Sequence, residues 1–261
     1  MIRLPCQMRH PAASRSSDPC ASRNRAEAAG AALLRQVAEW TDEAAGDGTA
    51  GAIVIAQLLA REAIAMVGLG SDPVALRQDI AAARDMAEQH VAGLARPAGS
   101  IGGRQTTAAR TPPAQPSRCV VGSVVPGGGV ALLSAARTLA ALGRRTGGTD
   151  RHFRLACSVV HRALEEPFRH ALQNAGIAPV RVMPRLLDHD DPDQAGVSLP
   201  SGEVVDMLAA GIVDPLAALQ AALRAGAAGL GADDGSDAAM ERRAREVWEA
   251  MLAAAEAEPP A

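Results

Sequence analysis

Four residues, Gly46-Asp47-Gly48-Thr49, stand immediately before a long apolar segment with helical periodicity. The first turn of a helix carries unpaired amide groups and a partial positive charge, so it can bind phosphate. Gly46 and Gly48 would let a ligand approach the backbone closely. Asp47 would repel a bare phosphate but would suit one that carries Mg²⁺, which prefers oxygen ligands. Thr49 adds a hydroxyl and is expected to cap the helix. The stretch is therefore interpreted as a metal-bridged polyphosphate site with Asp47 as the metal ligand.

The same residues also have a plainer interpretation. Asp-Gly is a common loop dipeptide, so the stretch also fits a capped turn with no ligand, and taken alone the local pattern favours that turn. Gly127–Gly129 lead into another apolar helix and are equally ambiguous, because three glycines also make an ordinary tight turn. Asp214-Pro215 most economically predicts a helix N-cap followed by proline at the first helical position.

Helical periodicity dominates the chain and indicates the elements that would carry these motifs. Aromatic residues make up 2% of the sequence and tyrosine is absent, which favours packed helices over β-sandwiches. Pro167 is expected to begin a new helix, because proline inside a helix removes a hydrogen bond. The predicted fold class is mainly α and multihelical, with at most small β elements. Helices are expected over about 26–44, 50–67, 73–94, from the glycines to 142, 150–165, 167–174, 179–187, a short one after Ser201, one from Pro215, and a last one over 237–255.

Composition excludes several classes of function. The net charge of −3 leaves no basic footprint for nucleic acid or an anionic membrane. All 26 basic residues are arginine, so mechanisms that need a lysine amine, such as a Walker-A loop or a Schiff base, are excluded. The cysteines form no C-x-x-C pair and are predicted to be reduced thiols of a cytoplasmic protein with no cysteine metal site. They are Cys6, Cys20, Cys119 and Cys157.

Targeting signals are not evident in the sequence. Residues 1–24 are rich in arginine and serine and lack the apolar run of a secretory signal, so they are expected to be a disordered leader. No apolar stretch is judged long and uninterrupted enough to span a bilayer.

Several other polar residues receive a structural interpretation. The acidic loop 188–193 lacks the glycine and glutamate of an EF-hand, so it is expected to be solvated. No Ser-His-Asp arrangement can be argued from the order of residues along the chain. Ordinary helix side chains are expected at His161 and His170, surface charges at Glu165 and Glu166, and core packing at Met207 and Met240.

Five blocks, in this order along the chain, resemble the equatorial domain of the GroEL-type chaperonins: AAGDGT…AQLLARE, SDPVALRQDI, VVPGGGVALL, RALEEPFRHALQNAG and SGEVVDMLAAGIVDP. Together they cover about residues 26–230. The resemblance implies a mainly helical domain that binds ATP or ADP with Mg²⁺, with K⁺ as a further candidate cation. It also implies that the family's inserted intermediate and apical domains are missing. The expected organisation is a first half over 25–96, a linker in place of those domains over 97–119, a second half over 120–232, and an amphipathic helix and tail over 233–261.

The resemblance also assigns roles to single residues. Asp47 matches the family's aspartate for Mg²⁺ and phosphate, and Gly48 and Thr49 match phosphate contacts. Gly127 and Gly128 match backbone contacts to the nucleotide. The remaining matches are Ser198, within Ser198-Leu199-Pro200 where the family has Asn-Ala-Ala against the base, Ile212, which would pack on the base, and Asp214, which would hold the ribose.

The chain departs from the family pattern at several points. Ala50 and Gly51 stand where the family has threonines, the family's lysine-bearing loops are absent, and the aspartate that positions the attacking water is missing with its domain. Hydrolysis is therefore expected to be weak, because phosphoryl transfer depends on positioning and on charge stabilisation.

Two functional hypotheses remain open. In the first, the chain binds Mg-ATP and takes part in ATP-dependent protein folding, alone or with full-length chaperonin subunits or unfolded proteins as partners. In the second, it is a non-catalytic helical interaction module, a degenerate paralogue that modulates or caps full-length chaperonin. Neither hypothesis involves nucleic acid or a membrane, and both leave the oligomeric state open.

Overall fold

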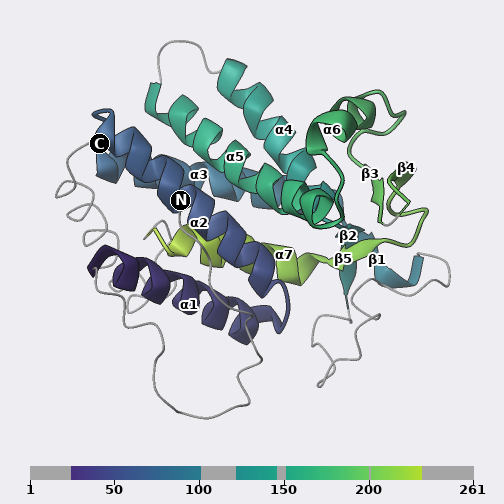
Figure 1. Ribbon diagram of the computed structural model, residues 1–261, viewed down its shortest axis with the longest axis horizontal. Coiled ribbons are helices and arrows are strands. Elements are labelled where there is room, and N and C mark those ends of the chain that lie inside the picture. The colour runs from purple at the N-terminus through teal and green to yellow at the C-terminus, as the bar shows by residue number, and fades with distance from the viewer. Residues whose placement is uncertain (1–24, 101–121, 146–150, 200, 231–261) are drawn as a thin grey trace.

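The computed structural model describes residues 25–100, 122–145, 151–199 and 201–230, and the structural statements below concern these ranges. The leader, most of the expected linker and the expected helix over 237–255 lie outside them. Helices dominate the described part (Figure 1), which confirms the mainly-α class. In chain order they are α1 (Arg25–Ala45), α2 (Thr49–Gly68), α3 (Pro73–Gly93), α4 (Val130–Arg145), α5 (Arg151–Asn174), α6 (Pro179–Leu187) and α7 (Leu216–Ala228).

Short strands form two small antiparallel sheets at one end of the helical bundle (Figure 1). The first sheet has the strand order β1-β2-β5 and the second is the hairpin β3-β4. The strands are β1 (Arg96–Pro97), β2 (Ser123–Pro126), β3 (Ala195–Ser198), β4 (Glu203–Asp206) and β5 (Val213–Pro215), and a 3-10 turn, η1 (Ala98–Ser100), follows β1.

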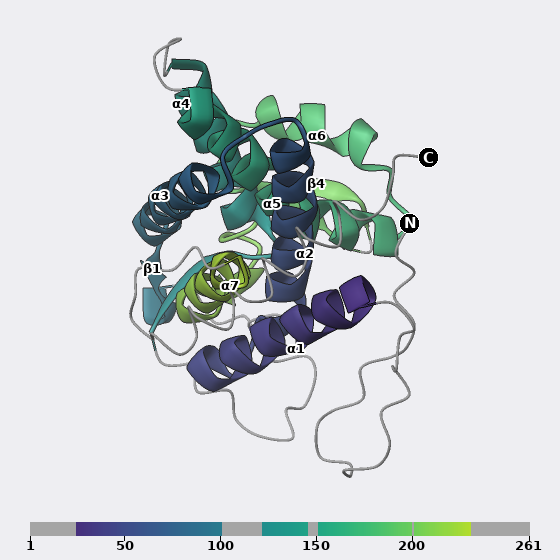
Figure 2. The same ribbon diagram turned by 90° about the vertical axis from the view of Figure 1, so that its left-hand side faces the viewer.

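Helix α2 is a central element of the bundle and packs against α1, α5 and α7 (Figures 1 and 2). Its buried side chains include Ile55, Leu58 and Leu59, which join the main core cluster. By length and composition α2 could span a membrane, with a hydropathy of 1.7 over its most apolar 18 residues, so the expectation that no stretch qualifies is wrong. The neighbouring helices explain this composition, because a helix packed on several sides needs apolar side chains on several faces.

The two halves of the chain meet in the first sheet. Arg96 pairs with Val124 and Pro97 with Ser123, and the amide of Ala98 donates to the carbonyl of Gly122 at 3.1 Å. Pro97 and η1 were expected to belong to the linker, but they continue the paired structure. Where the resemblance places two inserted domains, the flanking segments are hydrogen-bonded neighbours.

Helix α5 is continuous through Pro167, which corrects the prediction of two helices. Leu164, Phe168 and Leu172 are all buried along one side of it. Gly129 leaves room for this packing, because a Cβ there would lie 3.0 Å from the amide nitrogen of Phe168. Packing along an uninterrupted helix outweighs the one hydrogen bond that proline removes.

The short helix expected after Ser201 is also wrong, because this segment forms strand β4 of a hairpin. Ser198 pairs with Glu203, and Gly202 completes the turn with a φ of 74°. The amide of Gly202 donates to the carbonyl of Ser198 at 2.8 Å. An apolar run of this length does not by itself distinguish a helix from a strand, and here the glycine in the left-handed region favours the turn.

Candidate functional site

Three segments that the sequence singled out come together at the sheet end of the bundle. Gly48, between α1 and α2, packs on the first turn of α7, where an added Cβ would lie 3.1 Å from the carbonyl oxygen of Ala218. Gly127, between β2 and α4, lies against β5, where an added Cβ would lie 2.9 Å from backbone atoms of Val213. Both approaches require glycine. They bring the starts of α2, α4 and α7 to one place.

The turn before α2 differs from the expectation in one respect. Gly46 and Gly48 have φ angles of 68° and 84°, in the region that favours glycine. Gly48 is the N-cap residue, and the side chain of Asp47 accepts its amide at 2.7 Å. Thr49 begins the helix and is not its cap, and no side chain caps α2. The first amides of α2 are therefore left for another acceptor.

Asp214 is a strand residue and not the helix cap that was expected. It pairs with Val125, whereas Pro215 is the N-cap of α7. Its half-buried carboxylate accepts hydrogen bonds from the amides of Gly128 and Gly129. Burial, together with the negative charge of Asp47, raises the pKa of Asp214 from 3.8 to about 6, although those two hydrogen bonds oppose the rise.

Asp47 and Asp214 thus repel each other across the glycine turns. Within the described ranges neither carboxylate has a salt-bridge partner, and no group of three or more His, Cys, Asp or Glu side chains could hold a metal ion. A divalent cation beside these carboxylates would relieve their repulsion, and it would have to complete its oxygen shell with ligands such as phosphate oxygens and water. The residues present therefore fit Mg²⁺ with a polyphosphate better than Mg²⁺ alone.

The other predicted residues divide into two groups. Ile212 belongs to the site, because its carbonyl accepts the amide of Gly127 at 3.0 Å. Ser198 lies at the far end of β3, where its described contacts are with the hairpin turn. Leu199 beside it is 43% exposed, and Pro200 lies outside the described residues. The described contacts thus join the glycine turns, Ile212 and Asp214, but not Ser198.

A polar network that the sequence did not predict links α3, α4 and the acidic loop. The Oγ of Ser134 lies 2.7 Å from His90 Nε2 and donates to Asp193 Oδ1 at 2.7 Å. In a hydrolytic triad the histidine lies between serine and aspartate, whereas here a fully buried serine lies between the other two. The network is therefore structural and not nucleophilic. The one signal in the sequence was a serine inside an apolar stretch of α4.

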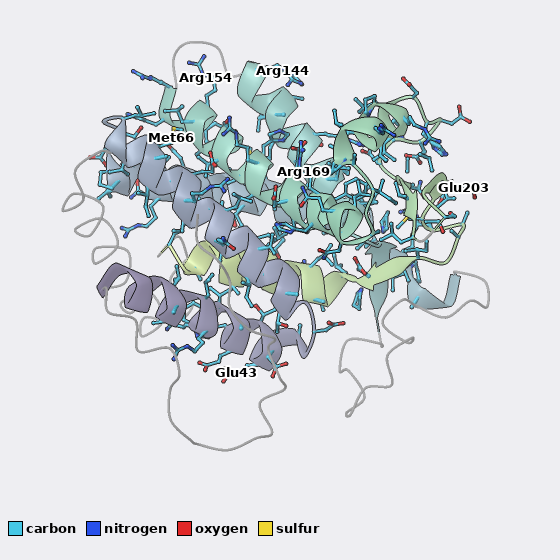
Figure 3. The ribbon with its side chains drawn as sticks, in the orientation of Figure 1. Glu43, Met66, Arg144, Arg154, Arg169 and Glu203 are labelled. Carbon is cyan, nitrogen blue, oxygen red and sulfur yellow. The ribbon has the colours of Figure 1, made fainter. Side chains whose placement is uncertain are left out.

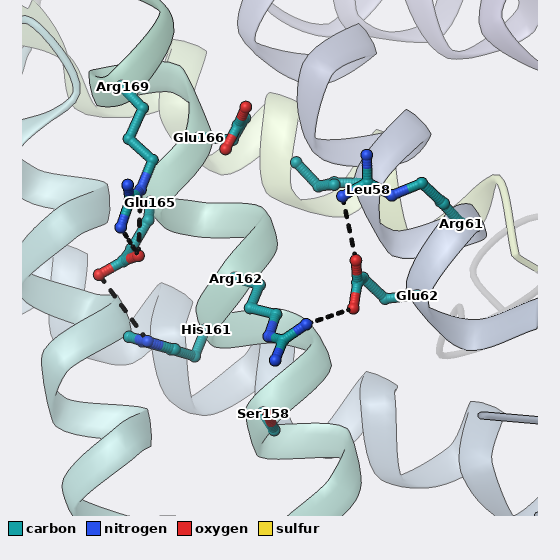
Figure 4. A pocket seen from close by; sticks show the side chains of 9 residues that line it. All are labelled: Leu58, Arg61, Glu62, Ser158, His161, Arg162, Glu165, Glu166 and Arg169. Carbon is teal, nitrogen blue, oxygen red and sulfur yellow. Dashed lines mark hydrogen bonds and ion pairs between the residues drawn. The ribbon is translucent and has the colours of Figure 1, made fainter. Parts of the chain in front are cut away.

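A separate groove lies between α2 and α5 (Figure 4), with a volume of about 460 Å³. Glu62 accepts hydrogen bonds from Arg61 at 3.0 Å and Arg162 at 2.9 Å. Glu165 pairs with Arg169 at 2.9 Å and its side chain is only 15% exposed, so it is not the plain surface charge that was expected. Exposed charges lie elsewhere on the surface (Figure 3), among them Glu43, Arg144, Arg154 and Glu203.

Comparison with known proteins supports the resemblance. Residues 117–229 match the sequence model of the TCP-1/cpn60 chaperonin family. The chain is 41% identical over 100 residues to the mitochondrial chaperonin CPN60-1 of Cucurbita maxima, covering 38% of this chain and 16% of that protein. It is 42% identical over 101 residues to chaperonin GroEL 1 of Polaromonas naphthalenivorans, covering 39% of this chain and 18% of that protein.

The matched family segment contains Gly127, Gly128, Ile212 and Asp214 but not Asp47, whose place in the site rests on the contacts described above. The alignments span less than a fifth of each of these relatives. Within that extent, residues 117–229 are similar to the TCP-1/cpn60 chaperonin family, and the mainly helical fold is consistent with the resemblance to the GroEL-type chaperonins.

Proposed function

We propose that the chain binds an adenine nucleotide with Mg²⁺ at the glycine-turn site. The observation that supports this most strongly is the approach of Asp47 and Asp214, which come from different halves of the chain, among backbone amides of glycine turns. Repulsion between the two carboxylates costs stability, and a bound cation would remove that cost.

Each residue has a distinct part in this proposal. Asp47 holds the cation, which neutralises phosphate charge when it is bound. The amides at the start of α2 and the hydroxyl of Thr49 donate to the phosphate oxygens, and Gly48 lets the phosphates approach the backbone. The turn Gly127–Gly128 lets the nucleotide approach the backbone.

The nucleoside part would be held by β5 and the hairpin. Asp214 would bind the ribose hydroxyls and Ile212 would pack on the base, whereas a contact of Ser198 with the base is implied by the resemblance alone. Hydrolysis stays weak, because no residue of the described site is placed to orient an attacking water.

The biological role that we infer is chaperonin-like protein folding in the cytoplasm. The named relatives are chaperonins, and this chain aligns with only a small share of their length. An ATP-linked role would therefore require full-length chaperonin subunits or unfolded proteins as partners.

Thermal unfolding with and without Mg-ATP tests nucleotide binding. A ligand at one hundred times its Kd should add about 2.7 kcal/mol of stability, which is a rise of a few degrees in Tm. Asp47→Asn should abolish that rise. Asp42→Asn is the matched control, because Asp42 is an exposed carboxylate one turn earlier, on α1. A rise that persists in Asp47→Asn would contradict the assigned role of Asp47.

The alternative role, a non-catalytic interaction module, is favoured by one observation. Ala50 and Gly51 leave the start of α2 without the hydroxyls that the family supplies. If millimolar Mg-ATP leaves the Tm of the wild type unchanged, the module becomes the better explanation. It would then be tested by adding the chain to a full-length GroEL-type chaperonin and measuring the ATPase rate of that chaperonin.

A further inference from the structure

The polar network around Ser134 fastens the acidic loop to two helices. Ser134, on α4, is fully buried and contacts His90 on α3 and Asp193 in the loop. One turn further along α4, Arg137 Nη1 donates to the carbonyl of Pro192 at 2.8 Å. Two side chains on the same face of α4 therefore hold neighbouring residues of the loop.

The hydrogen bonds place a proton on Nε2 of His90. The hydroxyl of Ser134 gives its single proton to Asp193, so it can only accept from His90 Nε2–H. All three side chains are thereby satisfied in one direction, from histidine to serine to aspartate. Removing the hydroxyl would take away the hydrogen-bond partner of His90 Nε2 and that of Asp193 Oδ1 in a half-buried environment.

A backbone path continues from this loop to the glycine turn. The carbonyl of Gln194, next to Asp193, accepts the amide of Met207 at 2.9 Å, and the carbonyl of Met207 accepts the amide of Ile212 at 2.8 Å. The carbonyl of Ile212 accepts the amide of Gly127 at 3.0 Å. Side-chain packing follows the same path, because a Cβ on Gly128 would lie 3.2 Å from the terminal methyl of Met207.

We propose that Ser134, together with His90 and Asp193, is a positioning unit that holds the glycine turn 127–129 in its binding conformation and so sets the affinity for the nucleotide. This inference rests on the proposed function. Helix α4 begins at the glycine turn and carries Ser134 on its second turn, so the turn is held directly by α4 and again through the loop, Met207 and Ile212. Loosening the second connection leaves α4 in place but frees one side of the turn.

The test compares the Kd for Mg-ATP by calorimetry, well below the Tm of each variant, with amide hydrogen exchange in the nucleotide-free protein. Ser134→Ala should weaken Mg-ATP binding about tenfold, by leaving His90 and Asp193 unpaired. It should also accelerate exchange at the amides of Gly127, Met207 and Ile212. Asp193→Ala should do the same, whereas Asp193→Asn keeps an acceptor for the serine and should stay within about twofold of wild type.

A matched control separates positioning from stability. Val160→Ala removes buried methyl groups from α5, in the main core cluster and away from the acidic loop, so it should lower the Tm without changing the Kd. The proposal is overturned if Ser134→Ala and Asp193→Ala lower the Tm as Val160→Ala does while Kd and exchange at the three amides stay at wild-type values.

The exchange measurement also distinguishes this failure from a failure of the proposed function. If the wild type binds no Mg-ATP, the nucleotide site is wrong and the role in affinity falls with it. Exchange at the three amides then still decides whether the unit holds the turn.

Discussion

The glycine-turn site and the groove between α2 and α5 handle charge in opposite ways. In the groove, Glu62 has two arginine partners and Glu165 has Arg169 (Figure 4). At the glycine turns, Asp47 and Asp214 approach each other, and among the described residues neither has a basic side chain as a salt-bridge partner. The pKa of Asp214 rises to about 6. The groove has a defined volume and its glutamates are paired with arginines, whereas the two aspartates at the glycine turns have no cationic partner among the described residues. This difference in charge is the reason why the glycine turns, and not the groove, are the proposed ligand site.

The two regions also differ in what holds them. Side chains that extend into solvent make the groove, such as Arg162 at 62% exposure, and pairs of this kind contribute little to stability. Backbone amides and close backbone contacts make the glycine-turn site. Substitutions should therefore lower the free energy of unfolding much more at the glycine turns than in the groove.

Gly127→Ala tests this difference where we expect the largest effect. The added Cβ would lie 2.9 Å from three backbone atoms of Val213, and backbone cannot move aside as a flexible side chain can. We expect a loss of about 3 kcal/mol or more in the free energy of unfolding, measured by chemical denaturation. Gly93→Ala is the control, because its Cβ would meet nothing within 4 Å and a change at the last residue of α3 should alter the free energy of unfolding by less than about 0.5 kcal/mol. Equal stability of the two variants would show that β2 and β5 do not pack as described.

Asp214→Asn should stabilise the nucleotide-free protein at neutral pH. The pKa of Asp214 in the folded protein, about 6, lies above the ordinary aspartate value of 3.8, so folding favours the protonated carboxyl. The stability that this group provides is complete below pH 3.8 and is lost as pH rises through 6. Above that range the ionised carboxylate costs up to about 3 kcal/mol, since each pKa unit corresponds to about 1.4 kcal/mol.

The measurement is the free energy of unfolding of both proteins from pH 4 to pH 8. The free energy of unfolding of the variant should rise relative to that of the wild type as pH increases between about 4 and 7. The reason is that asparagine keeps an oxygen for the two glycine amides but carries no charge. Asp47→Asn should recover part of the same gain by removing the neighbouring charge. Parallel pH curves for wild type and Asp214→Asn would contradict the raised pKa.

Much of the fold could be predicted because its signals are local. The cap of α3 is an example: Asp72 accepts the amides of Val74 and Ala75, and an aspartate followed by a proline is a common local signal for a helix start. The turn before α2 could be predicted for a similar reason, because Gly46 and Gly48 both have positive φ angles, whereas the ligand role of Asp47 stays a prediction. The resemblance then added Asp214, which local pattern alone placed as a helix cap.

The missed features depend on contacts between distant residues. Pro167 breaks a helix by local rules, yet Phe168 and Leu172 are buried along a continuous one. Ser134 is 44 residues from His90 and 59 from Asp193, so no spacing in the sequence could join them. Tertiary packing determined the structure in both cases. The residues that make these contacts are scattered along the sequence and form no local pattern from which the contacts could be predicted.

Gly202→Ala should have an intermediate effect, because it strains the hairpin beside the site without a steric clash. Gly202 has a φ of 74°, and an added Cβ would meet only Ile177 at 3.6 Å. The left-handed conformation should cost an alanine about 1 kcal/mol. Gly202→Asn should cost less, because asparagine tolerates this region. Unfolding free energies of the two variants give the comparison, and an alanine that is no worse than asparagine would mean that the turn rearranges.

Arg162→Gln should have the smallest effect and completes the comparison from the side of the groove. Arg162 is largely exposed, and Glu62 keeps Arg61 as a partner when it is lost. We expect a loss of about 0.5 kcal/mol or less, and a smaller one in 0.5 M salt, because exposed ion pairs are screened. A double-mutant cycle with Glu62→Gln isolates the pair. A coupling energy above about 1.5 kcal/mol that persists in salt would mean that the ion pair holds α2 to α5. The groove would then be a rigid feature, and its shape would be a stronger argument for a ligand site than the unpaired carboxylates at the glycine turns.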